Sequence, residues 1–148
     1  MKKIAILGST GSIGTQALDV IKQHPDQFEA RVLTAGSNAE LLIAQARAFV
    51  PDAVVIANES KYDQVKEALA DLPIKVYTGA EAICQVVQSD EVDIVLTAMV
   101  GFAGLRPTVA AIEAGKTLAL ANKETLVVAG SVILSYLSIV NIRLSFSA

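Results

Sequence analysis

The feature that most constrains the fold of this chain is a glycine-rich loop set between an apolar run and an amphipathic segment. Residues 3–7 are predicted to form a buried strand whose apolar run is residues 4–7, and residues 8–14 read Gly-Ser-Thr-Gly-Ser-Ile-Gly. Residues 12–23 then carry apolar side chains at helical spacing. The predicted buried stripe of that helix is Ile13, Ala17, Val20 and Ile21. A strand that passes through such a loop into a helix is typical of α/β folds with a parallel sheet.

Apolar strands and amphipathic helices alternate along the rest of the chain. Further strands are predicted at residues 28–35, 53–57, 74–77, 93–97 and 117–121. Further helices are predicted at residues 39–49, 61–70, 79–88, 105–114 and 124–134. Because this alternation covers both faces of a parallel sheet with helices, we predict a single doubly wound, Rossmann-like α/β domain.

The composition excludes several classes of protein. With 148 residues, 53% of them hydrophobic and 18% charged, the chain is not of the disordered type. Its net charge of −3 provides no basic surface of the kind that nucleic acids require, so we expect no nucleic-acid partner. The single cysteine, Cys84, cannot form an internal disulfide, which fits a reducing compartment.

Two segments bear on the location of the protein. The apolar run at residues 4–7 is too short for the hydrophobic region of a signal peptide, so we expect a cytoplasmic protein. Residues 125–142 carry no charge and are long enough to suggest a membrane span. They also contain Gly130, Asn141 and several hydroxyl residues, so we expect no span there.

The glycine loop predicts a phosphate site. In doubly wound folds this loop lies at the carboxyl edge of the sheet, where the N-terminus of a helix offers N–H groups to an anion. The spacing G-x-x-G-x-x-G is a variant of the dinucleotide fingerprint. A tight glycine turn without a ligand is the alternative. Because a strand precedes the loop and a helix follows it, we predict that residues 8–14 bind a pyrophosphate.

The end of the second strand indicates which dinucleotide is bound. NAD sites usually carry an acidic residue there, whose carboxylate would repel a 2′-phosphate. This chain has Gly36, Ser37 and Asn38 at that place, and none of them is charged. The pattern therefore favours NADP. The alternative is that Asn38 only caps the helix that follows.

Two later strands are followed by further candidate residues. Residues 97–101 are mostly small and allow a flat ring to approach. Asn122, Lys123 and Glu124 bring an amide, an ammonium group and a carboxylate together. Lys123 can bind an anionic substrate there, or the group can be a helix cap, with Asn122 as the N-cap and Glu124 in the first turn. We assign no role to His24 or Cys84.

Four motifs carry a resemblance to a known family. Residues 8–14, 35–38, 98–101 and 121–127, in this order and spacing, resemble the NADPH-binding domain of 1-deoxy-D-xylulose 5-phosphate reductoisomerases. The resemblance covers residues 1–134. It implies an NADPH-dependent rearrangement and reduction of 1-deoxy-D-xylulose 5-phosphate to 2-C-methyl-D-erythritol 4-phosphate, a step of non-mevalonate isoprenoid biosynthesis. It also implies a homodimer that needs a divalent metal, Mn or Mg.

The resemblance also implies roles for individual residues. The residues expected to hold the pyrophosphate are Thr10, Gly11, Ser12 and Ile13. Those expected at the adenosine ribose phosphate are Gly36, Ser37 and Asn38. Asn122 and Glu124 are expected near the nicotinamide, and Lys123 at the substrate. Ser37 departs from the family, because many relatives have a basic residue there, and we expect it to weaken NADPH binding slightly.

The resemblance stops after residue 134, and we interpret residues 135–148 as an aberrant tail. In the family, an Asp-Ser-Glu-His segment with metal ligands follows, and then catalytic and C-terminal domains. One choice of codons for residues 138–147, read in another frame, encodes Asp-Ser-Glu-His-Ser-Ala-Ile-Phe-Gln. We therefore hypothesise a frameshift near Ser135. On this interpretation the chain carries no catalytic or metal-ligating residue, and we expect neither turnover nor dimerisation.

Two other interpretations remain at this stage. The chain can be a non-catalytic NADP(H)-binding fragment or the product of a pseudogene. It can also belong to another NADP reductase with the same loop, such as an aspartate-semialdehyde dehydrogenase. That family needs a catalytic cysteine near the end of a strand, whereas Cys84 falls in a predicted helix.

Overall fold

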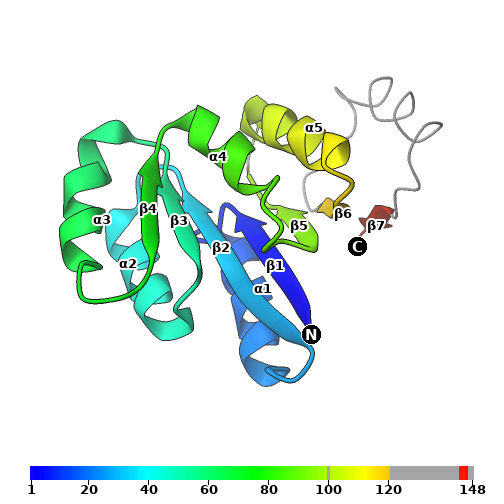
Figure 1. The fold of residues 1–148 in the computed structure, drawn as a ribbon, viewed down its shortest axis with the longest axis horizontal. Helices are drawn as coiled ribbons and strands as arrows, with labels where there is room; N and C mark the ends of the chain where they lie inside the picture. Colours follow the sequence, from blue (N-terminus) through cyan, green and yellow to red (C-terminus); the bar gives the residue numbers. More distant parts are fainter. Residues whose placement is uncertain (100, 121–143, 147–148) are drawn as a thin grey trace.

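A parallel sheet forms the centre of the structure, a computed structural model that describes residues 1–99, 101–120 and 144–146. The strands lie in the order β4-β3-β2-β1-β5-β6-β7 (Figure 1), and every neighbouring pair is parallel. They are β1 (Lys2–Leu7), β2 (Phe28–Ala35), β3 (Ala53–Ile56), β4 (Lys75–Thr78), β5 (Ile94–Thr97), β6 (Thr117–Leu120) and β7 (Leu144–Phe146). The predicted doubly wound parallel sheet is confirmed.

Helices cover both faces of this sheet (Figure 1). The helices are α1 (Ser12–Gln23), α2 (Ala39–Phe49), α3 (Tyr62–Ala68), α4 (Ala80–Val86) and α5 (Leu105–Glu113), with short 3-10 turns η1 (Glu59–Lys61) and η2 (Gly101–Gly104). Side chains of α1, α2 and α3 pack in one buried cluster, and side chains of α4 and α5 pack in another. Strand β3 contributes to both, since Val54 and Ile56 join the first and Ala53 and Val55 the second. Burial on both faces explains why a central strand such as β3, Ala-Val-Val-Ile, is continuously apolar.

Helix α1 buries only part of the stripe that its periodicity predicts, since Ile21 is buried and Ala17 packs against the core. Ile13 and Val20 are 39% and 49% exposed, whereas Gly14, Leu18 and Ile21 are buried. The helix is turned so that Gly14 faces the loop before it, where a Cβ on Gly14 would lie 2.2 Å from the carbonyl oxygen of Gly8. Close packing of backbone on backbone therefore sets the rotation of this helix.

Strand β2 contains a β-bulge that the sequence analysis did not predict. Ile4 pairs with Ala30 and Ala5 with Val32, which leaves Arg31 as the extra residue. The Arg31 guanidinium bonds Glu29 at 3.0 Å and also bonds Glu91, which lies just before β5. The bulge thus directs a cation from β2 toward the segment that connects α4 to β5.

The far edge of the sheet holds strand β7, in the part of the chain that the sequence analysis interpreted as an aberrant tail. Residues 144–146 pair in parallel with residues 118–120. Without β7, strand β6 would be at the edge and would present unpaired N–H and C=O groups to any extended segment. Backbone pairing of this kind does not depend on a family motif, which explains why the family motifs did not predict this strand.

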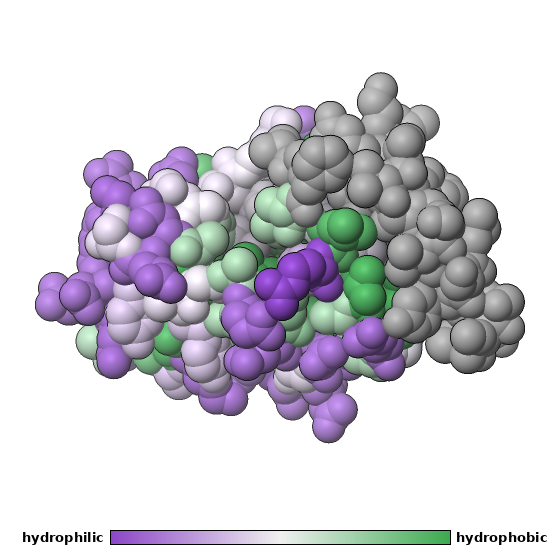
Figure 2. All heavy atoms as spheres, turned by 90° about the horizontal axis from the view of Figure 1, so that it is seen from above, coloured by the Kyte–Doolittle hydropathy of each residue, from purple (hydrophilic) through white to green (hydrophobic). Residues whose placement is uncertain are grey.

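The surface combines polar and apolar regions. Seen from above, hydrophilic residues cover much of the described periphery, and hydrophobic residues gather in the middle of the view (Figure 2). None of the helices in the described part of the chain is long and apolar enough to cross a membrane.

Candidate functional site

The glycine loop lies at the point where the strand order reverses. Strand β1 is flanked by β2 on one side and by β5 on the other, and the loop leaves the carboxyl end of β1. In doubly wound sheets ligands bind at this switch point. Gly8 has a φ of +85°, and a Cβ there would lie 2.7 Å from the carbonyl oxygen of Ala98, just after β5. Gly8 therefore lets the β1 and β5 connections approach each other closely.

Two other glycines of the loop have different surroundings. A Cβ on Gly14 would collide with the backbone of Gly8 and Ser9. A Cβ on Gly11 would meet only the carbonyl oxygen of Gly8, at an ordinary contact distance of 3.6 Å. The protein itself thus requires glycine at position 14 but leaves space at position 11. A ligand that approaches the backbone would use that space.

A buried pair of side chains supports the loop from below. Gln45 of α2 donates from Nε2 to the carbonyl oxygen of Ser9, and the Ser9 hydroxyl donates to Gln45 Oε1. Both hydrogen bonds are 2.8 Å long. Ser9 is fully buried and Gln45 is 7% exposed. The backbone N–H of Gly8 donates to the carbonyl oxygen and the hydroxyl of Thr34, at 3.2 and 3.1 Å. The loop is therefore fixed to both β2 and α2.

The N-terminus of α1 has the character of an anion site. Its N-cap, Gly11, has no side chain to cap the helix, and the first turn contains no acidic residue. The first-turn N–H groups and the positive end of the helix dipole are thus left for an anion. Of the predicted pyrophosphate residues, Gly11, Ser12 and Ile13 are exposed, and Thr10 is half-buried. The structure brings these residues together on one turn.

The predicted ribose-phosphate residues lie in the turn after β2. Gly36, Ser37 and Asn38 are all exposed. No heavy atom lies within 4 Å of where a Cβ on Gly36 would be, apart from its chain neighbours. Asn38 caps α2, because its side-chain oxygen accepts from the N–H of Leu41 at 3.2 Å. The predicted capping role of Asn38 is confirmed.

The third group of predicted residues lies outside the described part of the chain. This applies to Asn122, Lys123 and Glu124, and to the predicted helix at residues 124–134. The strand before them, β6, ends at Leu120 and pairs with β5 in register, with Leu120 opposite Thr97. The carboxyl ends of β1, β5 and β6 therefore lie along one edge of the sheet.

The remaining reactive groups lie elsewhere. Cys84 of α4 is half-buried, and burial raises the pKa of its thiol, which makes it a poor nucleophile. Within residues 1–99, 101–120 and 144–146, no group of three or more His, Cys, Asp or Glu side chains is placed to hold a metal ion.

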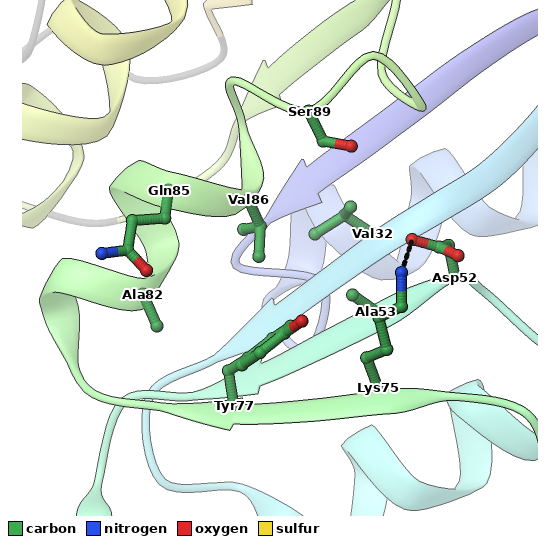
Figure 3. A pocket seen from close by; sticks show the side chains of 9 residues that line it. All are labelled: Val32, Asp52, Ala53, Lys75, Tyr77, Ala82, Gln85, Val86 and Ser89. Carbon is green, nitrogen blue, oxygen red and sulfur yellow. Dashed lines mark ion pairs between the residues drawn. The ribbon is translucent and has the colours of Figure 1, made fainter.

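Two surface hollows lie near α4. One, of about 190 Å³, lies over β2, β3 and β4 (Figure 3) and contains the ion pair between Lys75 and Asp52. The other, of about 460 Å³, lies between α4 and α5 and is lined by Cys84, Arg106 and their neighbours. Neither of these two is lined by a residue of the glycine loop.

Sequence reasoning missed three polar residues that support the site. Thr34 and Gln45 are buried among apolar residues, and Asn58 follows β3 beside the turn after β2. A polar residue on the buried side of a helix or strand is unusual unless it is hydrogen-bonded. Gln45, at the position of an otherwise apolar stripe, carried that signal in the sequence.

The fold and the loop together define a class of protein. A parallel sheet with a glycine loop and a helix N-terminus at its switch point is a doubly wound domain of the nucleotide-binding type. A family model described as 1-deoxy-D-xylulose 5-phosphate reductoisomerase matches residues 4–130. The chain belongs to this family, and the resemblance drawn from its motifs is confirmed.

Relatives and solved structures agree with that assignment. The chain is 69% identical over 132 residues to a 1-deoxy-D-xylulose 5-phosphate reductoisomerase of Bacteroides fragilis, covering 89% of this chain and 34% of the relative. A Porphyromonas gingivalis relative of the same name is 62% identical over 133 residues, covering 90% of this chain and 34% of the relative. The reductoisomerase of Zymomonas mobilis, solved in complex with NADPH, superposes with a TM-score of 0.92 at 37% identity. It covers 98% of this chain and 38% of that protein.

The match is partial in length. The chain spans about a third of the curated relatives, 34% in the Bacteroides fragilis case. More distant structures, such as an NAD-binding oxidoreductase of Klebsiella pneumoniae with a TM-score of 0.60 at 14% identity, share the fold alone.

Proposed function

We propose that this chain is the NADP(H)-binding part of a 1-deoxy-D-xylulose 5-phosphate reductoisomerase. The observation that carries the proposal is the space at Gly11 beside the uncapped N-terminus of α1, at the β1–β5 switch point. Family membership supports NADPH as the ligand of that space, because the Zymomonas mobilis relative was solved with NADPH. Another reductoisomerase was solved with NADPH, fosmidomycin and magnesium.

The proposed contacts follow the turns at the carboxyl edge. Thr10, Gly11, Ser12 and Ile13 hold the pyrophosphate on N–H groups and a hydroxyl. Gly36, Ser37 and Asn38 hold the phosphate on the adenosine ribose. Asn122 and Glu124 contact the cofactor near its nicotinamide, and Lys123 reaches the anionic substrate. When NADPH is bound, its nicotinamide supplies a hydride for reduction of a carbonyl.

The rearrangement and reduction of 1-deoxy-D-xylulose 5-phosphate to 2-C-methyl-D-erythritol 4-phosphate is proposed for the whole protein. The described residues do not fit a metal centre of their own, so no step through a metal is derived from them. Because the chain spans about a third of its relatives, we propose that the 148-residue polypeptide binds NADPH without turnover. We propose that it is monomeric, and that dimerisation belongs to the whole protein.

The domain boundary is also a proposal. We propose that residues 1–134 form the NADPH-binding domain and that residues 135–148 come from a shifted reading frame. The family model ends at residue 130, and the Bacteroides fragilis relative aligns over 132 residues. The coding DNA tests this idea, which fails if no second frame after the codon for Ser135 encodes the Asp-Ser-Glu-His segment.

Calorimetric titration of the purified chain with NADPH tests the proposed function. Saturable binding at one site is expected, and it should be lost when Gly11 is replaced by a larger residue. An assay with 1-deoxy-D-xylulose 5-phosphate, NADPH and manganese tests the second half of the proposal. Formation of product by this chain alone would contradict it.

A further inference from the structure

A small polar cluster lies where β2 and β3 end, next to the predicted ribose-phosphate turn. It consists of Ser37, Asn58 and Ser60, and we refer to it as the Ser37–Asn58–Ser60 cluster. Strands β2 and β3 pair in register up to Ala35 and Ile56. The pairing continues past the strands, because the N–H of Asn58 donates to the carbonyl oxygen of Gly36 at 2.9 Å. Backbone bonds therefore hold Asn58 beside the turn after β2.

The amide of Asn58 has a fixed orientation. Its Oδ1 accepts from the backbone N–H of Ser60 at 3.1 Å and from the Ser60 hydroxyl at 2.7 Å. Two donors on one side identify that atom as the oxygen, so Nδ2 is the atom that lies 3.2 Å from the Ser37 hydroxyl. The amide group is thus directed as a donor toward the turn where the ribose is proposed to bind.

This arrangement provides hydrogen-bond donors rather than acceptors. The Ser37 oxygen accepts a hydrogen from Asn58, so its own hydrogen is available to a ligand. Nδ2 of Asn58 carries a second hydrogen as well. Glu59 lies between Asn58 and Ser60, but its carboxylate is directed away from the turn after β2, since its Oε1 lies 3.5 Å from where a Cβ on Gly79 would be. Donors suit a phosphate, whereas recognition of a 2′-hydroxyl in NAD sites uses a carboxylate acceptor.

We propose that Asn58, acting with Ser37, is the residue that makes this chain prefer a 2′-phosphorylated dinucleotide. The inference rests on the proposed NADP(H) site. The proposed role of Asn58 also accounts for Ser37, which stands at a position where many relatives have a basic residue. A neutral pair of donors from two adjacent strands takes the place of that single cation.

The test compares two cofactors on matched variants of the full 148-residue chain. N58D replaces Nδ2 with a carboxylate oxygen, which repels a 2′-phosphate and can accept from a 2′-hydroxyl. We expect the ratio of NADPH to NADH affinity, measured by calorimetry, to fall by roughly tenfold or more. N58A removes the donor without adding charge, and we expect NADPH binding to weaken severalfold while NADH binding is unchanged.

The control is Q85E, which adds one negative charge on α4, in the hollow of Figure 3. It should leave the affinity ratio unchanged. Thermal melting checks that each variant is folded. If N58D does not fold, the affinities of N58A for the two cofactors provide the test. An unchanged ratio, or equal weakening of both cofactors, would overturn the role of Asn58. Failure of the unmodified chain to bind either cofactor would instead overturn the proposed function.

Discussion

Gln45 and Ser9 form a reciprocal pair of hydrogen bonds, each 2.8 Å long, between helix α2 and the glycine loop. The two residues are far apart in the sequence, and both are buried. Each therefore helps to satisfy the polar atoms of the other, and Thr34 of β2 accepts a further bond from the Ser9 hydroxyl at 3.3 Å. The shape of the loop consequently depends in part on a helix that does not itself contribute to the proposed pyrophosphate site.

Replacing Gln45 with methionine should destabilise the fold and weaken NADPH binding together. Q45M keeps the volume but removes the amide that donates to the buried carbonyl oxygen of Ser9, and leaves the Ser9 hydroxyl with only its longer bond, of 3.3 Å, to the carbonyl oxygen of Thr34. We expect a loss of about 2–3 kcal/mol in the free energy of unfolding, measured in urea. S9A is the matched control, because it keeps the bond from Nε2 to the carbonyl oxygen and should cost less. Equal unfolding midpoints for Q45M and the unmodified chain would contradict the role of the pair.

Glycine-to-alanine changes at positions 11 and 14 should have opposite consequences. G14A places a Cβ 2.2 Å from a backbone oxygen. That clash should outweigh the gain of about 1 kcal/mol in helix propensity and destabilise the protein by about 3 kcal/mol.

G11A should leave folding almost unchanged, because its Cβ would be in ordinary contact at 3.6 Å, but should abolish detectable NADPH binding. Thermal melting and calorimetry of the two variants measure the separation. Normal NADPH affinity in G11A would show that no ligand uses the space there.

The ion pair between Arg47 and Asp71 should make stability depend on acid pH. Hydrogen bonds from the Arg47 guanidinium, at 2.9 and 2.8 Å, lower the pKa of Asp71 to about 2. A carboxyl whose pKa is lowered by folding stabilises the native state above its unfolded pKa. That contribution is lost as the pH falls from about 4 toward 2.

Replacement of Asp71 by asparagine tests this dependence. D71N should be less stable than the unmodified chain at neutral pH, and the difference should vanish near pH 2. Because the pair is exposed, the difference should also shrink in high salt. Urea unfolding across this pH range provides the measurement, and a difference that persists at low pH would contradict it.

Lys116 should matter more to stability than Lys22, which is exposed on α1. Its Nζ donates to the carbonyl oxygens of Ser89 and Val92, both at 2.7 Å, which fixes the connection between α4 and β5. K116M should lower the free energy of unfolding by about 1.5–3 kcal/mol, since it removes charge-assisted bonds from a partly buried site. K22M, at an exposed position of α1, should be close to neutral. Chemical unfolding measures the stability of both variants, and an equal effect of K116M and K22M would contradict the role of Lys116.

Much of the fold follows from sequence periodicity. From β1 to β6, the strands, the helices and their order agree with the prediction, because buried parallel strands and amphipathic helices have distinct apolar patterns. Gly115 ends α5 in the left-handed region with a φ of +73°, as its position after the apolar stripe predicts. These strands, helices and the end of α5 depend on residues that are close together in the sequence, so the sequence predicts them.

The features that were missed depend on contacts between distant residues. The bulge at Arg31 becomes visible only when β1 and β2 are paired, and the exposed side of α1 only when Gly14 meets Gly8. The bond between Asn58 and Ser37 requires the register of two strands. None of these has a period or a motif in the sequence.

The strand order also determines when the site can form during folding. Strands β1 to β4 are neighbours both in sequence and in the sheet, so they can pair without the second half of the chain. Strand β1 keeps an open edge until β5, whose residues come much later, pairs with it. A growing chain would therefore complete half of the sheet first. Because Gly8 of the glycine loop packs against the backbone of Ala98, just after β5, the crevice for a dinucleotide is one of the last features to form.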